Sequence, residues 1–291
     1  MTQKYRHPLI GFIGQGFVGK HIADDFEARG YATVRYALEK PYSENKEKVQ
    51  SADIVFIAVP TPSTPSGFDS SVLESVLPLV GRGKTAVIKS TILPGTTEKL
   101  QQKHPGITVL FSPEFLLEAT AAHDAAFPVM NIVGIPEDSA TYRELAQHVL
   151  SVMPVSPFNR VCSVRAAEIF KYVHNIHGVW RILFANLMYD LVQAHGADWE
   201  EVHEAMNADP YMNAQASYYN RPTHKGGRGA GGHCFIKDLA ALREAYENAC
   251  PGDTHGISIF KHMEGKNIQL LKDSNKDIDL LEGVYGPRIK E

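Results

Sequence analysis

One stretch near the start of the chain decides the fold: Leu9-Ile10-Gly11-Phe12-Ile13-Gly14-Gln15-Gly16-Phe17-Val18-Gly19. Its apolar beginning predicts a strand, a helical pattern starts at Val18, and the residues between them fit G-x-G-x-x-G. Glycines in such a loop permit a tight turn and let the backbone approach a pyrophosphate at the N-terminus of the helix. The stretch therefore predicts a dinucleotide site. Its expected cofactor-binding residues are Gly14, Gln15, Gly16, Phe17, Val18 and Gly19.

The position that should hold the adenosine ribose departs from the usual pattern. An acidic residue is expected about 20 residues after the glycines, at the end of the second strand. That place holds Ala37, with Glu39 two residues later and with Arg35 and Lys40 on either side. Glu39 could serve NAD, whereas the basic residues could favour the 2′-phosphate of NADP. We expect NAD as the cofactor.

The first half of the chain alternates short apolar runs with amphipathic segments, which is typical of a parallel sheet with crossover helices. The predicted strands are 9–13, 32–36, 54–59, 85–89, 108–111 and 131–134. Later segments follow helical spacing, and the longest of them covers about 30 residues. The predicted helices are 18–29, 165–195, 198–206, 237–249 and 256–271.

These elements predict an α/β protein with two domains. We expect a Rossmann-like dinucleotide-binding domain over residues 1–155, ending near Pro154 and Pro157. An all-α central domain for dimerisation and catalysis should follow over residues 156–275, built around the long helix. Residues 276–291 are expected to form a charged, loosely held tail.

Composition excludes several classes of protein. The net charge of −4 gives no sign of nucleic acid or an anionic membrane as partner. No apolar run approaches the roughly 20 residues that a membrane span needs, and the N-terminus does not resemble a signal peptide. Three cysteines without paired spacing argue against disulfides and against a metal site. We therefore expect a cytoplasmic protein without a bound metal.

A second informative stretch is Gly231-Gly232-His233-Cys234-Phe235-Ile236-Lys237-Asp238. It places a lone cysteine in a glycine-rich loop, four residues ahead of an aspartate. A cofactor that accepts hydride, combined with a nucleophilic thiol, permits an aldehyde to be trapped, oxidised to a thioester and hydrolysed to an acid. The alternative is a small buried cysteine without chemistry, which we expect for Cys162 and Cys250.

Six segments together resemble the UDP-glucose/GDP-mannose dehydrogenase family of nucleotide-sugar dehydrogenases, in the family's order over about residues 9–275. They are residues 14–19; Val59-Pro60-Thr61-Pro62; Ser90-Thr91-Ile92-Leu93-Pro94-Gly95-Thr96; Ser112-Pro113-Glu114-Phe115-Leu116; Ala167-Glu168 with Lys171 and Asn175; and residues 231–238. The resemblance implies oxidation of a primary alcohol of a nucleotide sugar to a carboxylate, with two NAD used in succession. A UDP-glucose 6-dehydrogenase-like activity is therefore expected.

The resemblance also implies roles for individual residues. Cys234 would capture the aldehyde, and Lys171 and Asn175, one helical turn apart, would stabilise oxyanion charge. Asp238 would work with the lysine on proton transfer, Glu114 would act as the base for thioester hydrolysis, and Thr91 would orient the water. The further cofactor-binding residues are Val59, Pro60, Thr61, Thr91 and Glu118, and the substrate-binding residues are Phe115, Leu116, Arg228 and Gly231. The long helix is expected to form a homodimer.

The sequence departs from the family in three ways. The family's third, UDP-binding domain has no counterpart, so we expect a short form. Only about 17 residues separate the second strand from Ile54, where the family usually carries a helix and another strand. On the substrate side, His233, Ala230 and Tyr211 replace the residue types that are usual there. Two alternatives stay open: a two-electron dehydrogenase of a small hydroxy substrate, and a non-catalytic NAD-binding module.

Overall fold

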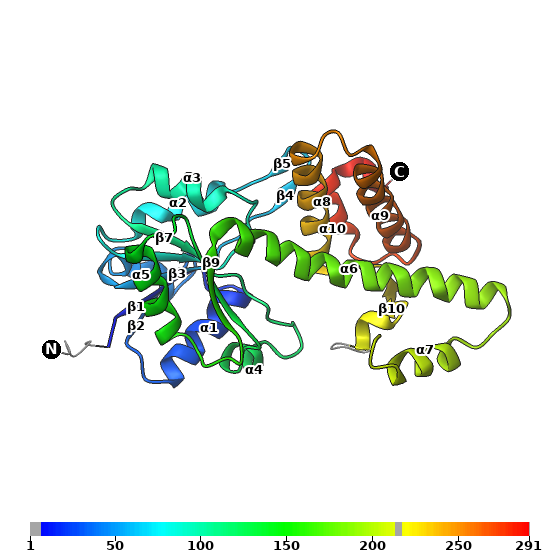
Figure 1. Ribbon diagram of the computed structural model, residues 1–291, viewed down its shortest axis with the longest axis horizontal. Helices are drawn as coiled ribbons and strands as arrows, with labels where there is room; N and C mark the ends of the chain where they lie inside the picture. The colour runs from blue at the N-terminus through cyan, green and yellow to red at the C-terminus, as the bar shows by residue number, and fades with distance from the viewer. Residues whose placement is uncertain (1–6, 213–216, 291) are drawn as a thin grey trace. The chain divides into compact units, whose positions relative to one another are not determined.

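The computed structural model of the chain describes residues 7–212 and 217–290 (Figure 1). Its internal contacts divide the chain into two compact units. The sheet unit comprises Met1–Thr61 and Asp69–Lys171, and the helical unit comprises Pro62–Phe68 and Tyr172–Glu291. The division falls inside the long helix, whereas the sequence predicted a boundary at residue 155.

A seven-stranded sheet forms the centre of the sheet unit, with the strand order β2-β1-β3-β6-β7-β8-β9. The strands are β1 Ile10–Ile13, β2 Thr33–Tyr36, β3 Ile54–Ile57, β6 Thr85–Ile88, β7 Thr108–Phe111, β8 Asn131–Ile135 and β9 Asn159–Ser163. Neighbouring strands run parallel, except that β7 and β8 are antiparallel. All six predicted strands are present, and β9 was not predicted.

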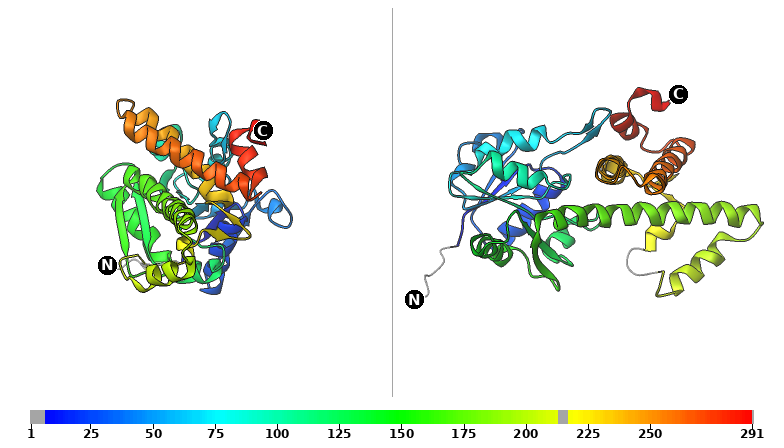
Figure 2. Two further views of the ribbon diagram at one scale, coloured as in Figure 1. Left: turned by 90° about the vertical axis from the view of Figure 1, so that its right-hand side faces the viewer. Right: turned by 45° about the horizontal axis from the view of Figure 1, so that its top comes forward.

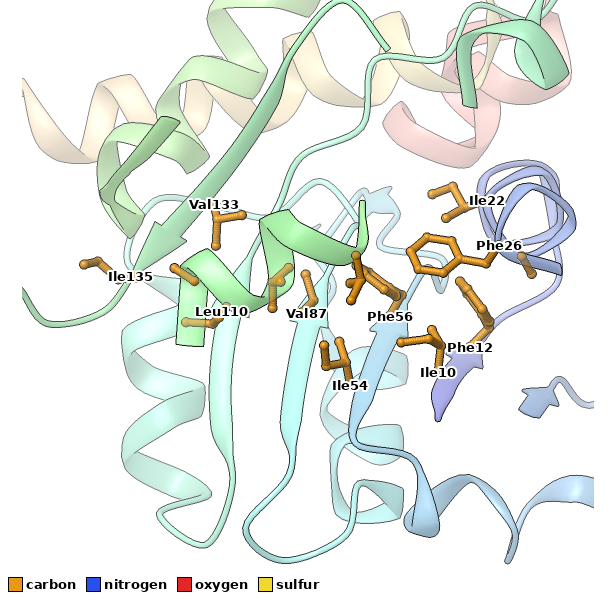
Figure 3. Close-up of a cluster of buried hydrophobic side chains, with 14 residues drawn as sticks. Ile10, Phe12, Ile22, Phe26, Ile54, Phe56, Val87, Leu110, Val133 and Ile135 are labelled. Carbon is orange, nitrogen blue, oxygen red and sulfur yellow. The ribbon is translucent and has the colours of Figure 1, made fainter. Parts of the chain in front are cut away.

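The sheet unit also contains the helices and turns that connect these strands. They are α1 Phe17–Ala28, η1 Tyr42–Asn45, η2 Val49–Ser51, α2 Ser71–Val76, η3 Leu77–Leu79, α3 Thr96–Lys103, α4 Ala121–Ala126, α5 Ala140–Val152 and the first turns of α6 Val164–Ala194. One face of the sheet packs against α1 and α5 through a cluster of buried apolar side chains (Figure 3). At its centre the rings of Phe12, Phe26 and Phe56 lie 5.3–5.7 Å apart. The predicted α/β architecture is confirmed.

The strand order changes direction at β1. The chain moves outward from β1 to β2, and then returns to the other side of β1 with β3. In open α/β sheets such a switch point leaves a crevice at the carboxyl ends of the strands, where ligands bind. The loop of residues 14–16 follows β1 and the loop of residues 58–62 follows β3, so the topology places the dinucleotide motif at this crevice.

The helical unit consists mainly of packed helices (Figure 2). It contains most of α6, α7 Trp199–Ala208, η4 Ser217–Asn220, α8 Gly232–Ala249, α9 Thr254–Asp273, α10 Ile278–Tyr285 and η5 Pro287–Lys290. Two short ribbons, β4 Ser63–Thr64 with β5 Gly67–Phe68 and β10 Thr223–His224 with β11 Gly227–Arg228, add strands to the domain that was expected to be all-α. No helix in the described part of the chain is both long and apolar enough to cross a membrane.

Two expectations about the helical unit are wrong. Helix α8 begins at Gly232, so Cys234 lies in the first turn of a helix and not in a loop. Residues after 275 do not form a loosely held tail, because α10 buries Leu281 and Val284 against Ile236 of α8 and Leu271 of α9. The helix is only eight residues long and follows the polar residues 272–277, so its short apolar pattern was not recognised.

Leu281→Ala tests whether α10 belongs to the core. Leu281 is fully buried, so truncation should lower the free energy of unfolding by about 2–5 kcal/mol in a urea titration. Leu38, which is 84% exposed, provides the matched control, and Leu38→Ala should change stability by less than about 0.5 kcal/mol. If the C-terminal segment were loosely held, both variants would have the same free energy of unfolding as the wild type.

Candidate functional site

The glycine loop after β1 has the shape that a pyrophosphate requires. Gly14 has a φ of +90°, and a Cβ there would lie 2.2 Å from the carbonyl oxygen of Ala58, so only glycine fits. A Cβ on Gly16 would meet nothing within 4 Å, which leaves open space beside the N-cap of α1. That helix has no side-chain cap and no acidic residue in its first turn, so its N–H groups are available to an anion. These residues fit a dinucleotide cofactor.

Two further loops at the carboxyl ends of the strands are fixed to each other. The Ser90 hydroxyl accepts a hydrogen bond from the Val59 N–H (3.0 Å) and donates one to the Val59 carbonyl oxygen (2.7 Å). The Thr61 hydroxyl donates to the Thr91 carbonyl oxygen at 2.7 Å. The structure therefore brings Val59, Thr61 and Thr91 together beside the glycine loop. Glu118 is exposed, in a turn just before α4.

The basic residue near the expected ribose position is already engaged. The Arg35 guanidinium lies 2.6 Å from Asp24 and 2.6 Å from Glu27, both on α1. It also reaches Gln15 of the glycine loop at 3.5 Å. Ala37 is buried and carries no group for a ribose. Two carboxylates thus neutralise Arg35 next to the cofactor loop.

Glu114, after β7, is held on both of its carboxylate oxygens. Oε1 accepts from the Phe115 N–H at 2.9 Å, and Oε2 lies 3.0 Å from the Lys89 ammonium. The Lys89 side chain is only 3% exposed, so Glu114 supplies the countercharge that a buried lysine needs. Sequence analysis missed Lys89. Its signal was a lysine that ends an apolar strand directly before Ser90-Thr91.

Lys171 contacts the same segment. Its ammonium donates to the Glu114 carbonyl oxygen at 2.5 Å and lies 5.2 Å from the centre of the Phe115 ring. The Phe115 ring also packs edge-on against Phe170 at 5.8 Å. The structure therefore assembles Lys171, Glu114 and Phe115 in the sheet unit, with Leu116 next to them in the chain and partly buried.

The first turn of α6 is anchored by a buried carboxylate. Glu168 accepts hydrogen bonds from the N–H of Gly95 (2.6 Å), the N–H of Thr97 (2.9 Å) and the Thr97 hydroxyl (2.7 Å). These donors lie at the N-terminus of α3, where a negative charge is stabilised. Burial nevertheless raises the pKa of Glu168 above its ordinary value, against the lowering effect of these hydrogen bonds. Glu168 fixes the helix three residues before Lys171.

In the helical unit, Asn175 and Asp238 form a buried pair. The Asn175 amide donates to the Asp238 carboxylate at 2.6 Å, and the Lys237 ammonium donates to its other oxygen at 2.6 Å. Asp238 is 1% exposed. Cys234 lies one turn earlier on α8 and is exposed, as a thiol that meets a substrate must be. Asn175 lies one turn beyond Lys171 on α6.

The predicted substrate-binding residues of the cysteine loop have partners within their own unit. The Arg228 guanidinium donates to the Asn186 side-chain oxygen at 2.7 Å and lies 2.6 Å from Asp190, both on α6. Gly231 is the N-cap of α8, where a Cβ would lie 2.0 Å from a carboxylate oxygen of Asp277. Substrate contacts by these two residues stay predictions.

The described site residues thus form two sets. Thr91, Glu114 and Lys171 belong to the sheet unit, and Asn175, Cys234 and Asp238 belong to the helical unit. Sequence analysis named all six as catalytic residues, which stays a prediction, and it did not name Lys89, Asn267 or Asp277; the last two hold the cysteine loop. These missed residues are polar side chains far along the chain from the residues that they contact, and no local motif marks Asn267 or Asp277.

Comparisons with known proteins identify a family for both units of the chain. The NAD binding domain of the UDP-glucose/GDP-mannose dehydrogenase family matches residues 31–151, and the central domain of that family matches residues 165–255. A putative UDP-glucose 6-dehydrogenase of Bacillus subtilis is 30% identical over 83% of this chain and 57% of its own length. GDP-mannose 6-dehydrogenase of Pseudomonas aeruginosa is 33% identical over 68% of this chain and 47% of its own length.

Solved structures give the same result for the fold. A UDP-glucose dehydrogenase from Pyrobaculum islandicum superposes with a TM-score of 0.76 at 25% identity, over 94% of this chain and 72% of that one. The chain spans only about half of the length of the curated relatives that it matches.

Glu168→Gln tests the anchor of α6. An amide nitrogen cannot accept a hydrogen bond, so at least one buried N–H or hydroxyl donor loses its partner, at a cost of about 1–3 kcal/mol of unfolding free energy. Because the folded protein holds the Glu168 proton more tightly than the unfolded chain, wild-type stability falls as pH rises above the ordinary value of 4.5. The cost of the substitution should therefore shrink with rising pH.

Urea titrations of both proteins between about pH 4 and about pH 8 measure this cost. Glu144→Gln, at an exposed position on α5, is the control and should give no pH-dependent difference. A cost that grows with pH would mean that the hydrogen bonds outweigh burial.

Proposed function

Because the chain belongs to the UDP-glucose/GDP-mannose dehydrogenase family, we propose that it oxidises the primary alcohol of a nucleotide sugar to a carboxylate, with NAD as the oxidant. The observation that carries this proposal is the exposed thiol of Cys234 in the first turn of α8, one turn before the buried Asp238. Cys250 is exposed as well, so the position of Cys234 one turn before Asp238, which Asn175 and Lys237 hold, is what sets this thiol apart. The names of the relatives, UDP-glucose and GDP-mannose 6-dehydrogenases, support the substrate class.

NAD, when bound, supplies the hydride acceptor for each of the two oxidations. The glycine loop and the N–H groups of the first turn of α1 would hold its pyrophosphate, and the fixed loop of residues 59–61 would supply further contacts. The ion pairs of Arg35 with Asp24 and Glu27 support NAD over NADP, because a 2′-phosphate near Arg35 would meet two carboxylates. The overall change converts the alcohol, water and two NAD⁺ into the carboxylate, two NADH and three protons.

In the first oxidation the alcohol carbon loses a hydride and its hydroxyl loses a proton, which gives an aldehyde. Lys171 and Asn175 stabilise negative charge on the oxygen, and Asp238 with the lysine accepts the proton. The Cys234 sulfur then adds to the aldehyde carbon, and the thiol proton moves to the oxygen. The product is a thiohemiacetal attached to the protein.

In the second oxidation the same carbon loses another hydride and the hydroxyl loses its proton, which leaves a thioester on Cys234. Glu114 removes a proton from water, oriented by Thr91, as the water attacks this thioester. The C–S bond then breaks, the acid is released and the thiol is restored.

One observation favours a second candidate function. Both carboxylate oxygens of Glu114 have partners, the Phe115 N–H and the Lys89 ammonium, which leaves fewer lone pairs for a hydrolytic water. A dehydrogenase that stops after one hydride transfer requires neither Glu114 nor Cys234 for chemistry. The number of NADH formed per substrate separates the two functions.

We further propose a homodimer through α6. Large apolar side chains are exposed along this helix at spacings of three, four and seven residues, which is typical of a helix seam. In the helical unit they are Val173, Trp180, Phe184, Leu187 and Leu191. In a two-fold dimer these side chains would pack against the same side chains of α6 in the second copy.

Cys234→Ser tests the chemistry. Purified protein with UDP-glucose or GDP-mannose should form about two NADH per sugar, whereas Cys234→Ser should form at most about one and no acid. Cys250→Ser is the matched control, because Cys250 is also exposed and lies at the other end of α8. One NADH per sugar in the wild type, unchanged by Cys234→Ser, would establish the two-electron alternative.

Trp180→Asp tests the dimer. A buried, unpaired carboxylate at a packed interface is strongly unfavourable, so the variant should sediment as a 32.2 kDa monomer where the wild type sediments at twice that mass. Ile259→Asp places the same charge at an exposed apolar position on α9 and should remain dimeric. If Trp180→Asp also sedimented as a dimer, the interface would lie elsewhere, and a monomeric wild type would contradict the dimer itself.

A further inference from the structure

The loop that leads into α8 is held by side chains from the end of α9 and the residues after it. The Ser274 hydroxyl accepts a hydrogen bond from the Arg228 N–H at 2.9 Å and donates its own proton to the Leu270 carbonyl oxygen at 2.7 Å. The Lys276 ammonium donates to the Gly229 carbonyl oxygen at 2.9 Å. Each contact with the loop joins residues more than 40 positions apart in the chain, so none is a by-product of local structure.

The next loop residues are held in the same way. The Asn267 side chain accepts from the Ala230 N–H (2.7 Å) and donates to the Ala230 carbonyl oxygen (2.9 Å), as a neighbouring strand would. Asn267 is 2% exposed, so water does not compete for these hydrogen bonds. The Asp277 carboxylate then accepts from the N–H of Gly232, the first residue of α8, at 2.7 Å. Four of the five loop residues from 228 to 232 therefore have backbone groups held by side chains.

The backbone that supplies these side chains is itself unusual. Asn275 and Asp277 have positive φ values of 51° and 54°, a left-handed conformation that residues with a side chain rarely adopt. The strained turn directs Lys276 and Asp277 onto the loop. The same contact explains Gly231, since any Cβ there would overlap the Asp277 carboxylate.

We propose that Asn267 and residues 274–277 form a clasp that positions the Cys234 thiol for aldehyde capture. Asp277 fixes the N-terminus of α8, and Cys234 follows two residues after Gly232 in the same turn. These contacts hold the loop in one position before substrate binds. Asp277 and Asn267 are positioning residues, and the proposal rests on the thioester chemistry proposed above.

The clasp has a distinct kinetic consequence. The first oxidation removes hydride and proton from the alcohol without the sulfur. Capture then forms the C–S bond, with the thiol proton passing to the carbonyl oxygen. A displaced thiol therefore leaves the first step intact and lets the aldehyde leave before capture, since small displacements cost bond-forming steps heavily.

The test measures the ratio of released aldehyde to acid. The full chain is incubated with NAD and with UDP-glucose or GDP-mannose, whichever of the two yields NADH. A hydrazine traps the released aldehyde. Asp277→Ala should raise this ratio about 10-fold or more. Asp277→Asn retains an acceptor oxygen and should stay near the wild type. Asp273→Ala, at an exposed position in the last turn of α9, is the matched control and should also leave the ratio unchanged. Because it is a ratio, the measurement does not depend on how much of a variant is folded.

A second measurement separates the clasp from the proposed function. Amide hydrogen exchange of residues 228–234, without substrate, should be faster in Asp277→Ala than in the wild type and unchanged in Asp273→Ala. If Asp277→Ala does not fold, Lys276→Met should give smaller changes in the same directions. Unchanged exchange would overturn the clasp, and faster exchange with an unchanged ratio would overturn its role in positioning Cys234. A wild type that forms no acid, with exchange as expected, would mean that the thioester chemistry is absent while the clasp is real.

Discussion

The position of α6 in the sheet unit depends on the buried carboxylate of Glu168. Three donors at the N-terminus of α3 hold it, and hydrogen bonds to a charged group each contribute about 1.5–3 kcal/mol. Removing an isolated carboxylate from water costs more than any one such bond, and the raised pKa shows that burial outweighs the three together. Glu168 is therefore a device for orientation at some expense of stability. What it orients is the start of α6, and hence Lys171.

The carboxylates of the site differ in their partners, and this difference matches their proposed roles. Asp238 is almost fully buried and is bound by an amide and an ammonium group. Glu114 is bound by a backbone N–H and by a lysine that sequence analysis did not identify. A buried carboxylate with two partners keeps one orientation, which suits proton transfer at a fixed position. A base that must approach water needs more freedom, so the Lys89 contact is where hydrolysis would be controlled.

Sequence reasoning succeeded where one segment contains all of the information. The strand, glycine loop and helix of residues 9–28 form one continuous pattern, and Lys171 and Asn175 are related by helical spacing alone. It failed where burial is supplied by a distant part of the chain. Strand β9 is mostly polar and shows no apolar alternation that would predict a strand. Its pairing with β8 stabilises it instead. The start of α8 was placed too late because its glycines suggested a loop, and their partner Asp277 lies 45 residues further on.

The abridged connection after β2 leaves that strand at the end of the sheet. Within the described residues β2 pairs with β1 alone, on one side. An open strand edge attracts strands of other molecules, and charged side chains on that edge oppose such pairing. Arg35 points its guanidinium at Asp24 and Glu27, while the Asn45 amide occupies the Arg35 carbonyl oxygen. An incoming strand would have to break that hydrogen bond and dehydrate three charges, so this small ionic cluster also protects the protein against edge-to-edge aggregation.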